Sequence, residues 1–156
     1  MRKGTRIPYI SHPMSVAALI LEADGSVENA CAGLLRDVLE DAGPEYAEEI
    51  RTRLYEDVLR LVDGCTDGVP DAAGEKEPWA IRKKRYIAHL KTVPDNVLMM
   101  SACDKLHNLR SILRDLNNGE AVFERFSVPK DKTLWCCDTL MTIFEAREPP
   151  LRAGNA

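Results

Sequence analysis

The sequence lacks the features that mark several common classes of protein. No apolar run is long enough to cross a bilayer, and no apolar segment near the start is typical of a secretory signal. The five cysteines form no CxxC pair and are odd in number, and no repeat is visible. Cys31 and Cys103 fall within apolar helical patterns and are predicted to be core residues. These observations exclude a disulfide scaffold and a solenoid, and they predict a soluble protein of a reducing, cytoplasmic compartment with no membrane partner.

Basic residues are fewer than acidic residues in this sequence. The chain has 21 Lys and Arg residues against 25 Asp and Glu residues, which gives a net charge of −4. Such a chain is not attracted as a whole to DNA or RNA, so a nucleic acid polymer is not expected as a partner. Basic residues are nevertheless grouped within residues 2–6 and within residues 82–85. Either group could bind a small anion such as phosphate.

Patterning of the β type is also scarce. No alternation of period two is long enough for a strand, whereas apolar residues recur at helical spacing along most of the chain. At 156 residues and 45% hydrophobic content, the chain can form one domain with its own core. The pattern predicts a single all-α domain over residues 1–147, followed by a flexible tail over 148–156. The predicted helices cover residues 13–23, 26–41, 46–54, 56–64, 78–91, 95–117 and 134–147, with an exposed loop over 65–77.

The helix expected over 26–41 carries an unusual set of carboxylates. Its wide apolar stripe predicts a central, mostly buried element. Asp37, Glu40 and Asp41 lie at positions i, i+3 and i+4 and therefore share one face. Burying several carboxylates requires a cation, either a bound metal or nearby Arg and Lys side chains. The alternative is a solvated helix end, which the helix dipole weakly disfavours because the charges are negative.

The helix expected over 95–117, also predicted to be buried, contains an aspartate within its apolar stripe. Asp104 has Asn108 one turn later on the same face, and such an aspartate is usually paired or bound to a ligand. An internal salt bridge to Lys105 or Arg110 is the alternative explanation. His12 precedes the first predicted helix, a position that by itself is typical of a cap or a surface residue.

Taken together, these segments resemble the HD-domain phosphohydrolases, and in particular the hydrolase domain of RelA/SpoT proteins and the small alarmone hydrolases. Five stretches occur in the family's order and at about its spacing: RKGTRIPYISHP (2–13), AGLLRDVLEDA (32–42), VLRLVDGCTD (58–67), RKKRYIAHL (82–90) and SACDKLHNLRSIL (101–113). Five ordered motifs are more specific than any one of them. The resemblance implies a helical HD-domain bundle that removes the 3′-pyrophosphate of guanosine-3′,5′-bis(diphosphate), ppGpp, a small-molecule nucleotide.

The resemblance also implies roles for individual residues. The family holds one divalent metal, commonly manganese, through a first His, an adjacent His-Asp pair and a distant Asp. The matching positions here are His12, Asp37 and Asp104. The family's Glu-Asp pair, which acts near the attacking water, matches Glu40 and Asp41. The residues expected beside the nucleotide are Arg2, Lys3, Tyr9 and Asn108.

The sequence departs from the family at one ligand position. Arg36 stands where the family has the His of the His-Asp pair, and a guanidinium has no lone pair to offer a metal. Either three protein ligands hold the metal less tightly, or the guanidinium replaces the metal and neutralises Asp37 and Asp104. A further departure is that the helix that family members usually carry before the first motif is apparently absent.

Three hypotheses about function follow. The first is a metal-dependent phosphohydrolase of ppGpp or a similar nucleotide, with weakened activity. The second is a non-catalytic, nucleotide-binding relative without a bound metal, which Arg36 favours. The third, a helical interaction module with solvated charge clusters, is disfavoured by the five ordered motifs. The sequence does not determine the oligomeric state.

Overall fold

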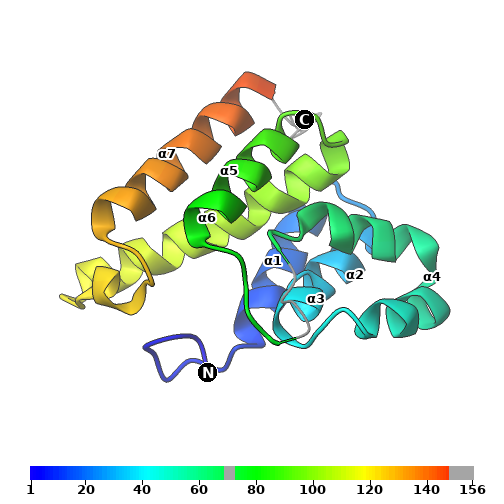
Figure 1. Ribbon diagram of the computed structural model, residues 1–156, viewed down its shortest axis with the longest axis horizontal. Helices are drawn as coiled ribbons and strands as arrows, with labels where there is room; N and C mark the ends of the chain where they lie inside the picture. The colour runs from blue at the N-terminus through cyan, green and yellow to red at the C-terminus, as the bar shows by residue number, and fades with distance from the viewer. Residues whose placement is uncertain (69–72, 148–156) are drawn as a thin grey trace.

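The computed structural model describes residues 1–68 and 73–147, and these residues form helices and no strand. The prediction of an all-α fold is therefore confirmed. The α-helices, labelled in Figure 1, are α1 (Ser11–Glu22), α2 (Val27–Leu35), α3 (Val38–Asp41), α4 (Tyr46–Cys65), α5 (Trp79–Leu90), α6 (Asp95–Asn117) and α7 (Lys130–Arg147). A 3-10 helix, η1 (Val122–Arg125), lies between α6 and α7 in the sequence. The tail predicted over 148–156 lies outside the described residues.

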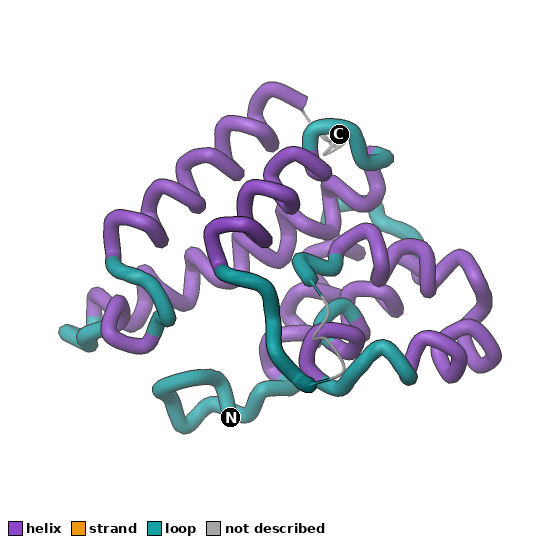
Figure 2. The backbone as a smooth tube through the Cα atoms, in the orientation of Figure 1, coloured by secondary structure: helices purple, strands orange, loops and turns teal. Residues whose placement is uncertain are grey.

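The helices form two groups that meet along α6. The first group, α1 to α4, lies on one side of α6, and α5 and α7 lie along its other side (Figure 1). The segment before α1 is a loop that extends past the lower edge of the first group (Figure 2). The core between the helices contains fully buried Val16 and Ile20 of α1, Val62 of α4 and Leu98 of α6. This packing fixes the start of α1 beside the middle of α6.

The predicted helix over 26–41 is divided in two. Ser26 caps its start, since its hydroxyl accepts from the Asn29 amide at 3.2 Å while the Asn29 side chain accepts from the Ser26 amide at 3.0 Å. Helix α2 ends at Leu35 and α3 begins at Val38, so Arg36 and Asp37 lie at the junction. The helix is also less buried than its apolar stripe predicts.

Other boundaries differ from the sequence pattern in smaller ways. The two helices predicted on either side of Tyr55 form one element, α4, interrupted at Tyr55, where φ is +74°. Helix α7 begins at Lys130, four residues before the predicted start, and η1 was not predicted. The C-terminal half of α6 is more exposed than expected: Leu113 is 59% exposed. Among the described residues, no helix combines the length and the apolar character needed to cross a bilayer.

Candidate functional site

Four parts of the chain meet around one cavity of about 310 Å³, which we call the central cavity. They are the N-terminal segment, the start of α1, the α2–α3 junction and the middle of α6. The lining residues are Arg2, Lys3, Tyr9, His12, Arg36, Asp37, Asp41, Asp104, Lys105 and Asn108. Apart from Glu40, the structure therefore brings together every site residue that the sequence analysis singled out.

Asp104 is the most buried member of this group, with no exposed surface. Its Oδ1 atom accepts from Arg36 Nη1 at 2.6 Å and from Asn108 Nδ2 at 3.1 Å, and His12 Nε2 lies 3.0 Å away. Its Oδ2 atom accepts from Lys105 Nζ at 2.8 Å. Burial alone would raise the pKa of Asp104, but the charges of Lys105 and Arg36 and the hydrogen bond from His12 hold it well below 3.8. Asp104 is therefore an ionised carboxylate, and the salt bridge to Lys105 is present.

Arg36 links the two aspartates that were expected to hold a metal. The same nitrogen, Nη1, lies 2.6 Å from Asp104 Oδ1 and 2.8 Å from Asp37 Oδ1. Burial would lower the pKa of this guanidinium, but the two carboxylates outweigh burial and raise it. Arg36 is therefore a buried, permanent cation between the two carboxylates.

This arrangement does not fit a divalent metal at His12, Asp37 and Asp104. Arg36 Nη1 already lies between the aspartate oxygens, where the metal would have to sit, and His12 Nε2 lies 3.0 Å from the same Asp104 oxygen that Arg36 contacts. Among the described residues, no group of three or more His, Cys, Asp or Glu side chains is placed to hold a metal ion. The structure thus matches the alternative in which the guanidinium neutralises the carboxylates.

Tyr9 closes one side of the central cavity. Its hydroxyl donates a short hydrogen bond to Asp37 Oδ2, and burial together with the charge of Asp37 raises the pKa of the phenol. The phenol therefore remains protonated at neutral pH and keeps Asp37 oriented. Tyr9 is still 40% exposed, which leaves its ring accessible to a ligand.

His107 belongs to the site but was not predicted from the sequence. Its Nδ1 lies 2.7 Å from Nδ1 of His12 and 3.3 Å from Nη1 of Arg2. Burial, with smaller contributions from the neighbouring His12 ring and the Arg2 guanidinium, lowers the pKa of His107 to about 4, so its ring is neutral. The available signal was its spacing of three residues from Asp104 on one helix, which alone indicates no role.

The two carboxylates of the Glu-Asp pair differ in their contact with the central cavity. Asp41 lines the central cavity, whereas Glu40 is not among its lining residues. Glu40 Oε1 accepts from the backbone amide of Asp67 at 2.6 Å, and Lys76 lies 3.7 Å from both carboxylates of the pair. Burial raises the pKa of Glu40. The break between α2 and α3 lies just before these residues: the Asp41 amide donates to the Asp37 carbonyl at 2.8 Å, so the three carboxylates keep helical spacing, although only Asp37 and Asp41 line the central cavity.

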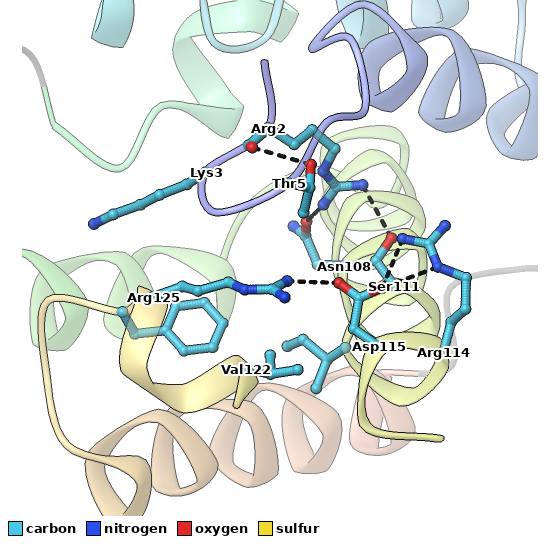
Figure 3. A pocket seen from close by; sticks show the side chains of 11 residues that line it. Arg2, Lys3, Thr5, Asn108, Ser111, Arg114, Asp115, Val122 and Arg125 are labelled. Atoms are coloured by element: carbon cyan, nitrogen blue, oxygen red, sulfur yellow. Dashed lines mark hydrogen bonds and ion pairs between the residues drawn. The ribbon is translucent and has the colours of Figure 1, made fainter. Parts of the chain in front are cut away.

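A second cavity, of about 150 Å³, adjoins the first; we call it the basic cavity (Figure 3). Arg2, Lys3 and Asn108 line both cavities, and Arg114 and Arg125 line only the basic one. Arg2 donates to Ser111 Oγ at 3.0 Å and to Asn108 Oδ1 at 3.1 Å, which fixes its guanidinium over α6 (Figure 3). The basic residues near the N-terminus thus lie at the site.

The other basic group, residues 82–85, is engaged elsewhere. Arg82 Nη1 lies 2.8 Å from Asp67 Oδ2, and Lys83 contacts the same oxygen. Arg85 pairs with Glu77 at 2.5 Å. These contacts neutralise much of the charge of this group within the chain, so the N-terminal group is the better candidate for an anion.

Comparisons with known proteins agree with this fold and site. A model of the HD domain matches residues 1–125. A Xenopus tropicalis protein named guanosine-3′,5′-bis(diphosphate) 3′-pyrophosphohydrolase MESH1 is 31% identical over 111 residues, which cover 70% of this chain and 58% of the relative. An Aquifex aeolicus protein named guanosine-3′,5′-bis(diphosphate) 3′-pyrophosphohydrolase is 33% identical over 71% of this chain, but only 15% of that protein is covered. The chain thus spans just over half of the first relative and a small part of the second.

A solved structure supports the same assignment. The crystal structure of lmo0812 from Listeria monocytogenes EGD-e superposes with a TM-score of 0.74 and 27% identity, covering 86% of this chain and 83% of that one. The ppGpp hydrolases of the HD family are metal-dependent, which makes Arg36 a departure from a shared requirement. Because the HD-domain match covers most of its length, with the site residues gathered at one cavity, this chain belongs to the HD-domain family.

Proposed function

We propose that this chain is a weakened phosphohydrolase that takes a pyrophosphorylated guanosine nucleotide, ppGpp or a close analogue, and removes its 3′-pyrophosphate. The observation that carries the proposal is the convergence of basic and carboxylate side chains on one cavity of an HD fold. Relatives that match this chain are named for that reaction. The proposed ligand is a small-molecule nucleotide. We expect the protein to bind it in the cytoplasm.

The two adjoining cavities suit an elongated ligand that has phosphates at both ends of a nucleoside. Arg2 and Lys3 line both cavities and would bind phosphate oxygens or stack on the base. Asn108 would contact the sugar or a phosphate, and the accessible ring of Tyr9 would lie beside the nucleotide. These four residues form the substrate-binding set of the proposal.

Hydrolysis requires a proton acceptor for the attacking water and positive charge near the leaving pyrophosphate. Asp41 lines the central cavity and would accept the proton from the attacking water. Glu40, whose Oε1 accepts from the Asp67 amide, would assist Asp41 as the neighbouring carboxylate of the pair. Arg2 and Lys3 would stabilise charge on the phosphate oxygens. Mn²⁺ held by His12, Asp37 and Asp104 is what the family relationship suggests, but the present arrangement does not fit the ion. A reaction without such an ion is slow, because nothing lowers the pKa of the water.

The second candidate function is nucleotide binding without hydrolysis. The observation in its favour is the position of Arg36, which bridges Asp37 and Asp104. A pocket of this kind retains its phosphate-binding residues while lacking an activated hydroxide. Such a protein would sequester or sense the nucleotide.

One experiment tests both candidates. ppGpp is titrated into the purified chain by calorimetry, and release of pyrophosphate is followed separately with MnCl₂ present. The first candidate predicts saturable binding with slow release, and the second predicts binding with no release. Absence of both binding and release would overturn both proposals. GDP serves as the matched control ligand, since it lacks the 3′-pyrophosphate and should bind more weakly.

A further inference from the structure

We infer that the Arg36 guanidinium takes the place of the divalent metal, so that the carboxylates of the central cavity are satisfied, and a phosphate can be held, without any metal ion. The part of this inference that concerns the metal rests on the geometry alone, and the part that concerns phosphate rests on the proposed function. On this inference, the metal requirement of the HD-family ppGpp hydrolases does not extend to this chain, because Arg36 stands between the two aspartates.

The charges of the two aspartates expected to hold the metal are already balanced by the cations that contact them. Asp37 and Asp104 contribute two negative charges, and Arg36 and Lys105 contribute two positive charges within 2.8 Å of those carboxylates. An added divalent cation would leave an excess of positive charge in a site where Asp104 is fully buried. Charge balance therefore opposes metal binding.

The coordination positions are occupied as well. Asp104 Oδ1 accepts from both Arg36 and Asn108, and His12 lies against the same oxygen. First-row and alkaline-earth cations need ligand oxygens and nitrogens at about 2.0–2.6 Å with free lone pairs. A metal could enter only by displacing Arg36 from Asp104, which would break a buried ion pair.

Arg36 also brings its positive charge to the wall of the central cavity. Its Nε atom is buried and has no hydrogen-bond partner among the described residues, and the side chain lines the central cavity with Arg2 and Lys3. Since the Nε atom itself has no exposed surface, an incoming phosphate oxygen would meet the part of the guanidinium side chain that lines the cavity and would be attracted by its charge beside Arg2 and Lys3.

The test begins with the metal alone and needs no nucleotide. Thermal unfolding is recorded in EDTA and in MnCl₂ for the wild type, for Arg36→His, and for Arg53→His on the exposed surface of α4 as the matched control. We expect the melting temperature of the wild type to be the same in both buffers. Arg36→His should melt roughly 10 °C lower in EDTA, because a buried pair is broken, and should recover much of that loss in MnCl₂. The control should resemble the wild type.

Two results would overturn the inference about the metal. One is a rise in the wild-type melting temperature with MnCl₂ as large as that of Arg36→His, or one Mn²⁺ retained per wild-type chain after gel filtration. The other is a folded Arg36→His chain that does not respond to MnCl₂. If the variant does not fold, the wild-type measurements decide alone, since an unchanged melting temperature and no retained Mn²⁺ support the inference.

The second arm uses ppGpp in EDTA. Binding by the wild type with the metal chelated supports the holding of phosphate without a metal ion, and binding only after Mn²⁺ is restored contradicts it. A chain that binds no ppGpp under either condition, yet shows the expected Mn²⁺ behaviour, would refute the proposed function and the phosphate role while leaving the metal replacement intact. The two failures are therefore distinguishable.

Discussion

At the scale of single residues, the site depends on a carboxylate that could not remain buried alone. Asp104 has no exposed surface and is balanced by Arg36 and Lys105. Asp104→Asn keeps the shape of the side chain but removes its charge, so Lys105 loses its carboxylate and Arg36 keeps only Asp37. We expect the free energy of unfolding to fall by about 3–5 kcal/mol in urea denaturation. Asp138→Asn on the exposed face of α7 is the control, with a change under about 0.5 kcal/mol.

The same carboxylate predicts a dependence on pH. The pKa of Asp104 lies well below 3.8 in the folded chain, and 3.8 is the ordinary value expected on unfolding. A lowered folded pKa gives stability that is fully present above 3.8 and is lost as pH falls toward the folded pKa. The difference in unfolding free energy between the wild type and Asp104→Asn should therefore be constant above about pH 5 and shrink below 3.8. A difference that grows on acidification would contradict the assignment.

Arg2 provides the corresponding prediction for the ligand. Its guanidinium is held by Ser111 and Asn108 and lines both cavities. Arg2→Ala removes a charged donor and should weaken ppGpp binding roughly 10- to 100-fold, measured by calorimetry. Arg6→Ala, which removes an exposed charge nearby, should change the affinity much less. Equal losses in both variants would indicate long-range attraction rather than direct contact.

At the scale of elements, helix existence was predictable and helix breaks were not. The apolar period alone predicted the helices, and Asp24-Gly25 correctly marked the end of α1. The break at Arg36 and Asp37 escaped prediction because apolar residues continue at helical spacing through it. At this break Arg36 pairs with Asp104 of a distant helix, α6, and this long-range contact cannot be read from the local sequence.

The α1–α2 corner offers a test of this packing. A Cβ atom added to Gly25 would lie 2.7 Å from the carbonyl oxygen of Ile20 and 2.5 Å from its side chain. The backbone of Ile20 cannot move aside as the end of a flexible side chain can. Gly25→Ala should therefore reduce the free energy of unfolding by about 1–3 kcal/mol and lower the urea midpoint. An unchanged midpoint would mean that the corner is looser than the structure describes. This corner matters because α1 positions His12.

At the scale of the whole molecule, the site could be anticipated only through the ordered motifs. Composition and spacing suggested that Asp104 needed a partner, but they left a metal, Lys105 and Arg110 as alternatives. The meeting of His12, the α2–α3 junction and α6 depends on contacts between residues almost a hundred positions apart, which helical periodicity does not encode. The contact of His107 with His12 and the bond from the Asp67 amide to Glu40 could be found only in the structure, because each joins residues far apart in the sequence.

The cysteines provide a prediction for the whole fold. All five are free, and burial raises the pKa of both Cys65 and Cys103 to about 11. Few of these two thiols are ionised at neutral pH, so they should react slowly with a thiol reagent while the chain is folded. Without reductant, all five should react rapidly in guanidinium chloride. Fewer than five reactive thiols in the unfolded chain would reveal a disulfide and contradict a reducing environment.

The account depends most on Arg36, and one comparison tests it directly: pyrophosphate release from ppGpp in MnCl₂ by the wild type and by Arg36→His. Histidine restores a ligand with a lone pair beside Asp37 and removes the guanidinium from between the two carboxylates. We predict slow or absent release by the wild type and at least about tenfold faster release by the variant, abolished by EDTA. A wild type that is already as active as Arg36→His would show that the guanidinium does not stand in the metal's place.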